Sequence, residues 1–134
     1  MLLRVVFLLA VASIPLTANQ QNHVPSCCEP ESERLSQQQV KALLEKAEPI
    51  QAPCCADTLH ISGTVVVLIS VDPKGSVICV QVVSGHPLII GVTIESVRKW
   101  KFEPYISKGV SKTFCGRIAL RFNASEHAAN YRIV

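Results

Sequence analysis

Six cysteines are the residues in this sequence whose type and spacing could support chemistry. Thiolates bind metal ions, exchange disulfides in redox enzymes or form structural disulfides. The sequence contains neither the C-x-x-C spacing of zinc sites and thiol oxidoreductases nor a matching pair of histidines. We therefore favour structural disulfides and expect no metal, no cofactor and no catalytic residue. The cysteines are Cys27, Cys28, Cys54, Cys55, Cys79 and Cys115.

The pairing of these cysteines stays open at the level of sequence. Disulfides between the two vicinal pairs would close a loop of about 27 residues, worth about 3.5 kcal/mol on the chain-entropy model. Cys79 and Cys115 fall on strands that the expected sheet order separates, so a direct bond between them would contradict that order. Each of these two either bonds the segment before the first long strand or stays a buried free thiol. Metal binding by thiolates with His23 or His60 is the functional alternative.

The first residues indicate an exported protein. Residues 1–18 combine Arg4, an apolar run and small exit residues, which is typical of a secretory signal peptide; an uncleaved anchor is the alternative. Their removal takes away one Arg and no acid, so the formal net charge falls from +3 to +2. This charge and the few aromatic residues argue against nucleic-acid binding. We expect a periplasmic or secreted protein in an oxidising compartment, or an inner-membrane anchored one if residues 1–18 stay uncleaved.

A helix and a hairpin are expected to follow a flexible lead-in at residues 19–35. Ser36 and Gln39 fit a capping box, which predicts a helix over 37–48, within an N-terminal segment 36–48 that ends before Pro49. Two β-rich runs, opened by Gly63 and by Ser76, are joined by a tight turn over 72–75 and predict a hairpin. Both runs are apolar on two faces, so we expect this sheet to be covered on both sides.

The second half of the chain predicts a helix and a final strand. An apolar stripe runs from Leu88 to Trp100, with basic residues in the expected last turn and Pro104 beyond it. Residues 111–122 alternate strictly and predict a strand with one apolar face. The tail, 124–134, carries one short β-rich segment at 131–134.

The resulting order is α-β-β-α-β in an α+β domain. A right-handed crossover from the second strand to the third places the third strand beside the first. We therefore expect a small three-stranded antiparallel sheet in the order 2-1-3, packed by helices. The third strand then lies at an edge, with unpaired backbone groups.

Residues 49–123 resemble the TonB C-terminal domain. The resemblance rests on the valine-rich hairpin with its turn, the segment Ser84-Gly85-His86-Pro87, the run Val97-Arg98-Lys99-Trp100-Lys101-Phe102 followed by Pro104, and the later glycine. These elements occur together at matching spacings. The residues that it marks as structural are Gly63, Gly75, Gly85, Pro87, Trp100, Phe102, Pro104 and Gly109.

The resemblance implies a non-enzymatic domain that grips an extended segment of an outer-membrane receptor by strand addition at the third strand, as part of energy-coupled transport. Homodimerisation through the same edge is a further expectation. A stand-alone, disulfide-stabilised secreted module without transducer activity is the alternative. The edge residues expected to bind the partner are Thr113, Cys115, Arg117, Ala119 and Arg121.

Overall fold

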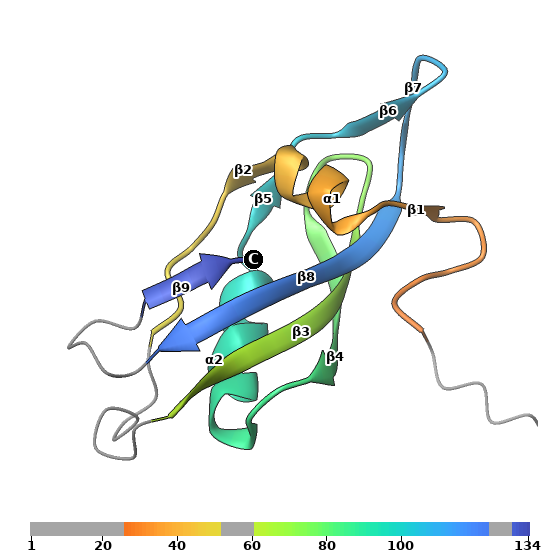
Figure 1. Cartoon of the computed structure of the whole chain (residues 1–134). Helices are drawn as coiled ribbons and strands as arrows, with labels where there is room; N and C mark the ends of the chain where they lie inside the picture. The colour runs from red at the N-terminus through yellow and green to blue at the C-terminus, as the bar shows by residue number, and fades with distance from the viewer. Residues whose placement is uncertain (1–25, 52–60, 124–129) are drawn as a thin grey trace, which may run out of the picture.

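The computed structural model describes residues 26–51, 61–123 and 130–134 (Figure 1). Several expectations fall outside these ranges and are not addressed by the structure: the signal segment 1–18, most of the lead-in, Cys54 and Cys55, and the histidines His23 and His60.

The fold is built on one five-stranded sheet. Three long strands lie antiparallel in the order β8-β3-β4, and two short strands, β1 and β9, both pair with β8. The two helices and this sheet confirm the α+β class. The strands are β1 (Glu33–Arg34), β3 (Ser62–Val71), β4 (Val77–Ser84), β8 (Phe114–Asn123) and β9 (Asn130–Ile133).

The three long strands have the expected order 2-1-3, as β4-β3-β8, but the expectations of only three strands and of β8 at the edge of the sheet are wrong. On the side away from β3, β8 pairs in parallel with β1 at its start and antiparallel with β9 at its end. Two causes lie in the chain itself. A disulfide from Cys28 to Cys115 holds the segment before β1 against β8, and the β-rich tail segment folds back as β9.

The β3–β4 hairpin forms around the predicted turn. The Asp72 side chain accepts hydrogen bonds from the Lys74 and Ser76 amides through Oδ1, both at 2.9 Å, and Gly75 N donates to Asp72 O at 3.0 Å. Gly75 has φ 88° and lies directly against the Phe102 carbonyl, where a Cβ would overlap it. The turn is thereby tied to the segment that follows the second helix.

The first helix, α1 (Gln37–Leu43), begins as predicted and ends early. The capping box is present, with Ser36 Oγ accepting from Gln39 N and Gln39 Oε1 accepting from Ser36 N. The predicted end at 48 is wrong, because β2 (Leu44–Lys46) pairs antiparallel with β5 (Lys101–Phe102). That pairing requires extended backbone from Leu44 onward.

The second helix, α2 (Pro87–Val97), is capped by the His86 side chain, whose Nδ1 accepts from Leu88 N at 3.3 Å. It is shorter than predicted, so the basic residues Arg98, Lys99 and Lys101 follow the helix instead of filling its last turn. The reason is again β5, which needs extended backbone by Lys101. Of the helices in the described residues, none is long and apolar enough to cross a membrane.

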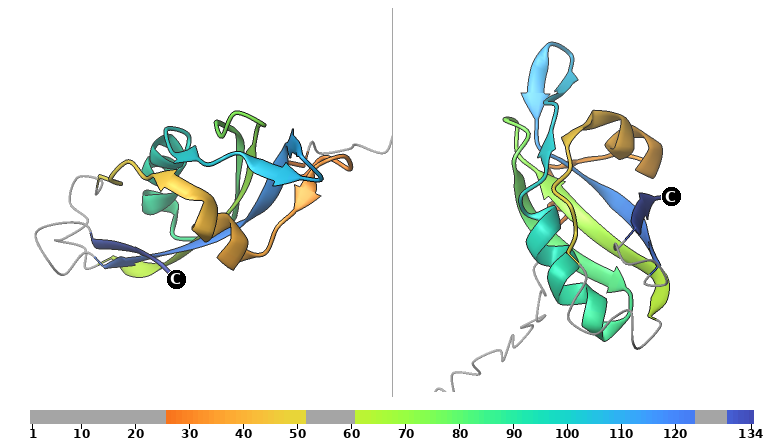
Figure 2. Two further views of the ribbon diagram at one scale, coloured as in Figure 1. Left: turned by 90° about the horizontal axis from the view of Figure 1, so that it is seen from above. Right: turned by 90° about the vertical axis from the view of Figure 1, so that its left-hand side faces the viewer.

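Both helices lie on the same face of the sheet, α2 against β3 and β4 and α1 against β8 (Figure 2), so the helices cover one side of the sheet and not, as expected, both. The core between them contains the alternate residues of the strands, as the pattern of β8 predicted. Trp100 is part of this core and donates from Nε1 to Glu48 O at 3.0 Å, a carbonyl that also accepts from Ser96 Oγ at 2.9 Å. The largest fully buried side chains include Phe102, Phe114, Phe122, Ile69, Ile89, Ile118, Leu120 and Val40.

The predicted last strand is split at Thr113. Its first residues form β7 (Val110–Lys112), which pairs with β6 (Tyr105–Ser107) in a hairpin that projects from the body of the molecule (Figure 1). Lys108 and Gly109 both have positive φ, 53° and 75°, which closes the two-residue turn.

Candidate protein-binding edge of the sheet

The five residues expected to bind a partner lie on β8 and immediately before it. The carbonyls of Thr113 and Cys115 accept from Glu33 N and Leu35 N at 3.0 and 2.9 Å, on the side away from β3. Because alternate residues of a strand point their backbone groups to the same side, Arg117, Ala119 and Arg121 present theirs outward as well. We call this side of β8, from Thr113 to Asn123, the outer edge.

The outer edge is occupied at both ends by segments of the same chain. β1 covers its start, with Glu33 opposite Phe114 and Arg34 opposite Cys115. β9 covers its end, in a register that runs from Leu120 opposite Ile133 to Asn123 opposite Asn130. Val134 N extends this cover by donating to Ala119 O at 3.0 Å.

Arg117 lies in the gap between the two covering strands. Within the described part of the chain, its backbone N–H and C=O have no partner on the outer edge. Beside it is a hollow of about 450 Å³ whose lining includes Leu68, Cys28 and the start of α1. An incoming strand would meet backbone groups that are ready to pair at this point.

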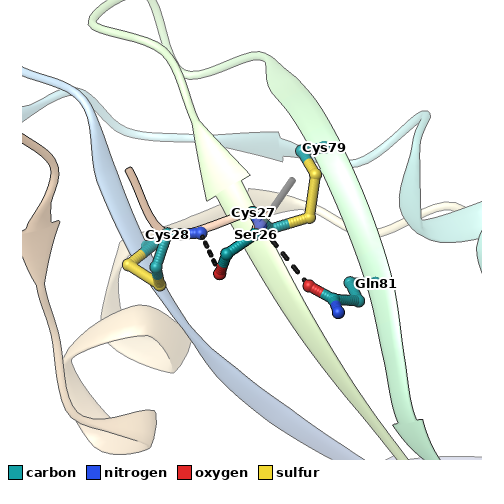
Figure 3. Close-up of a disulfide and its surroundings, with 6 residues drawn as sticks. Ser26, Cys27, Cys28, Cys79 and Gln81 are labelled. Carbon is teal, nitrogen blue, oxygen red and sulfur yellow. Dashed lines mark hydrogen bonds between the residues drawn. A yellow bond between two sulfur atoms is a disulfide. The ribbon is translucent and has the colours of Figure 1, made fainter. Parts of the chain in front are cut away.

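Two disulfides fix the start of the outer edge. Cys27 bonds Cys79 of β4 and Cys28 bonds Cys115 of β8, each with a Cα–Cα distance of 5.5 Å. Figure 3 shows the neighbouring Cys27 and Cys28 with the hydrogen bonds that hold this segment: Cys27 N donates to Gln81 Oε1 at 3.4 Å and Cys28 N to Ser26 Oγ at 3.2 Å.

This pairing decides between the open alternatives for four of the six cysteines. Cys79 and Cys115 bond the segment before the first long strand, which was one of the two expectations for them. The expected loop between the vicinal pairs is wrong, because Cys27 and Cys28 are already bonded elsewhere. Across the described residues, no group of three His, Cys, Asp or Glu side chains could hold a metal ion.

The cover formed by β9 depends on residues that sequence reasoning did not assign to the site. Gln37 Nε2 and Lys41 Nζ, on α1, donate to the carbonyls of Val134 and Ile133. The β-rich character of 131–134 was a visible signal for the strand itself. Its position on β8, and the helix side chains that hold it, follow only from the folded arrangement.

The opposite edge of the sheet, on β4, is the competing site for a partner strand. β4 ends the sheet order, and no strand of the described residues pairs with its outer side. It carries no charged residue, and Ile78 and Val83 are 60% and 48% exposed. Any test of the outer edge of β8 must therefore report on β4 too.

Comparison with known proteins identifies relatives of this fold. Residues 53–124 match the family model described as Gram-negative bacterial TonB protein C-terminal. Among solved structures, the solution NMR structure of the Pseudomonas aeruginosa TonB CTD is similar at 25% identity with a TM-score of 0.51. That similarity covers 59% of this chain and 82% of the other. A search of curated proteins gives no match.

Proposed function

The chain belongs to the Gram-negative bacterial TonB C-terminal family, and from that premise we propose that it is an exported, non-enzymatic domain that binds an extended segment of an outer-membrane receptor or a similar protein. Binding takes place by strand addition to β8. The observation that carries this proposal is the outward direction of the backbone at Arg117, Ala119 and Arg121, on an edge that extra strands already occupy. Within the described residues, Arg117 still offers a donor and an acceptor without a partner on this edge, and such a position is a ready template for a partner strand.

The two ends of the outer edge differ in how firmly they are closed. The start is held by the Cys28–Cys115 disulfide, so β1 stays in place while that bond is intact. The end is closed by β9 through backbone pairing and the hydrogen bonds from Gln37 and Lys41, all of them noncovalent. The partner strand therefore enters at Arg117 and replaces β9 as far as Asn123.

Nuclear magnetic resonance of the isotope-labelled, disulfide-bonded protein tests this proposal. Synthetic peptides from the periplasmic segments of outer-membrane receptors are titrated, and the amide shifts and hydrogen exchange of β8 are followed. We expect changes over 117–123 and release of β9. Changes confined to β4 would overturn the assignment to β8.

A pair of substitutions at Arg117 separates backbone pairing from side-chain effects. Arg117→Pro removes an N–H that has no partner on the outer edge within the described residues, and we expect it to abolish partner pairing. Arg117→Ala keeps the N–H and is the matched control. Equal partner affinity in the two variants would contradict strand addition at this residue.

The two disulfides fit a second candidate equally well, a stand-alone secreted binding module that is not coupled to an inner-membrane motor complex. Both candidates use the same edge, and they differ in what the mature chain is attached to. Mass spectrometry of the native protein gives its N-terminus and its disulfides together. Retention of residues 1–18 supports the coupled transducer, whereas cleavage supports the stand-alone module.

A further inference from the structure

Four arginines gather on the face of the sheet opposite α2, along the outer edge. The even-numbered residues of β8 are buried against the helices, so Arg117 and Arg121 point to the other face, where both are exposed. Arg34 lies opposite Cys115 and Arg132 lies opposite Arg121, which gives their side chains the same face. We call Arg34, Arg117, Arg121 and Arg132 the arginine row.

The arginine row has no carboxylate partner in the part of the chain that the structure describes. The ion pairs there join Lys46 to Glu48 and Lys112 to Glu33, and neither involves an arginine. Glu33, the acid on β1, is thus already paired with Lys112 at 3.4 Å. The charge of the row remains available to a ligand.

β9, which covers the end of this edge, is a poor electrostatic match for the arginine row. β9 places Arg132 directly opposite Arg121, in a pair that exchanges backbone hydrogen bonds. Like charges directly opposite each other on a sheet are destabilising. A strand with an acidic residue at the Arg132 position would replace this repulsion by an attraction and would keep the same backbone bonds.

From the arginine row we propose that the partner strand is acidic, with carboxylates opposite Arg117 and Arg121 and apolar residues between them on the other face. This inference rests on the strand addition proposed above and names the chemistry of its partner. The apolar requirement follows from β9, whose Ile133 lies opposite Leu120 and packs against the core.

The register sets the spacing of the motif. Positions opposite Arg117 and Arg121 are four residues apart on an added strand, and the residues between alternate between the two faces. The partner motif is therefore acid, apolar, any, apolar, acid. Because this pattern reads the same in both directions, it suits a parallel or an antiparallel strand.

Three matched peptides test the motif on the full, disulfide-bonded chain. The probes are acetyl-Thr-Glu-Val-Thr-Val-Glu-Thr-amide and its versions with Gln or Lys in place of both Glu residues. We expect the Glu peptide to bind at least about threefold more tightly than the Gln peptide, and the Lys peptide to bind most weakly. The difference should shrink at 1 M salt, where the Debye length falls to about 3 Å.

Charge reversal on the protein supplies the controls. Arg121→Glu or Arg117→Glu alone should cancel the preference, because one of the two cross-strand pairs becomes repulsive, and the double variant should invert it so that the Lys peptide binds best. Lys99→Glu changes the net charge equally but lies just after α2, in a hollow that it lines with Glu95 and Ser96 of that helix, and should leave the order of the peptides unchanged.

The outcomes separate this inference from the proposed function. Equal affinity of the three peptides, with amide shifts over 117–123, would overturn the acidic motif and leave strand addition standing. Absence of any peptide-induced shift on β8 would overturn strand addition and the motif with it. An altered peptide order in Lys99→Glu would show that net charge, and not the arginine row, sets the preference.

Discussion

Cys79 and Cys115 lie in one row across the sheet, on either side of Ser70, and bond the consecutive residues Cys27 and Cys28 instead of each other. Ser70 pairs with both in the strand register and is only 2% exposed. Two adjacent cysteines thus link β4 and β8, the two strands that flank β3. This disulfide clamp fixes the sheet and one end of the outer edge at the same time.

Loss of the clamp should lower stability in two separable steps. The disulfides span 52 and 87 residues, and each is worth about 4 kcal/mol on the chain-entropy model. Denaturant unfolding of Cys27→Ser/Cys79→Ser and Cys28→Ser/Cys115→Ser should each show a loss of this order. Only the second pair frees β1, so amide exchange at Cys115 or its replacement should quicken in that variant alone. Equal exchange in the two variants would contradict a specific role for Cys28–Cys115 at the edge.

Gly116, which has no side chain, allows α1 to pack closely against β8. A Cβ at Gly116 would overlap the Val40 side chain and press on Leu35 O. Gly116→Ala should therefore cost about 1–3 kcal/mol of unfolding free energy, the usual cost of overpacking a core. Val40→Ala in the same chain should recover part of that loss.

Gly91 is the matched control for this substitution. It lies within α2, and a Cβ there would meet nothing within 4 Å. Gly91→Ala should raise the unfolding free energy by about 0.5–1 kcal/mol, because alanine favours the helix interior. A similar loss in both variants would exclude the contact with Val40 as the cause.

The element types and the core face could be predicted from the sequence because they depend on local pattern. A few neighbouring residues determine each of these features: the capping box at Ser36, the turn at Asp72 and the alternation of β8. The ends of both helices could not be predicted, because β2 and β5 are too short to leave a periodic signal and exist only as a pair. Long-range pairing decides those boundaries.

The candidate site was harder to predict for the same reason. The outward register of Arg117 and Arg121 follows from alternation, and it could be derived before any fold was known. The covers on the outer edge could not, since β1 depends on a disulfide that spans 87 residues and β9 on contacts with α1. The edge could therefore be predicted from the sequence, whereas the pairing of β1 and β9 with it could not.

Substitutions of Ser96 and Trp100 should have coupled effects on the free energy of unfolding, because both side chains donate to the Glu48 carbonyl. Ser96→Ala and Trp100→Phe each leave one donor in place; Ser96→Ala should cost about 1 kcal/mol, and Trp100→Phe about 2–3 kcal/mol because it also leaves a cavity in the core. The double variant leaves Glu48 O without either donor, and because this acceptor is only part-buried we expect a further loss of about 1 kcal/mol, the low end of the cost for an unsatisfied acceptor. Chemical unfolding of the four proteins measures this, and strictly additive losses would show that water replaces the donors.

Arg132→Glu should turn β9 into a stronger cover of the outer edge. The substitution places a carboxylate directly opposite Arg121, so a like-charge pair becomes an attractive cross-strand pair. We expect a gain of about 0.5–1 kcal/mol in β9 pairing, seen as slower amide exchange at Arg121. The same variant should bind the Glu peptide more weakly, because the partner now displaces a better occupant.

Arg132→Gln distinguishes the loss of repulsion at Arg121 from the gain of an attractive pair with it. It removes the like charge without adding a carboxylate, so exchange at Arg121 should fall between the values for the original chain and for Arg132→Glu. Arg121→Glu combined with Arg132→Glu restores a like-charge pair of opposite sign and should return the exchange rate towards the original. If the double variant instead keeps the slow exchange of Arg132→Glu, the charge pair does not set the strength of β9. The stability of the cover would then rest on Gln37, Lys41 and the backbone ladder.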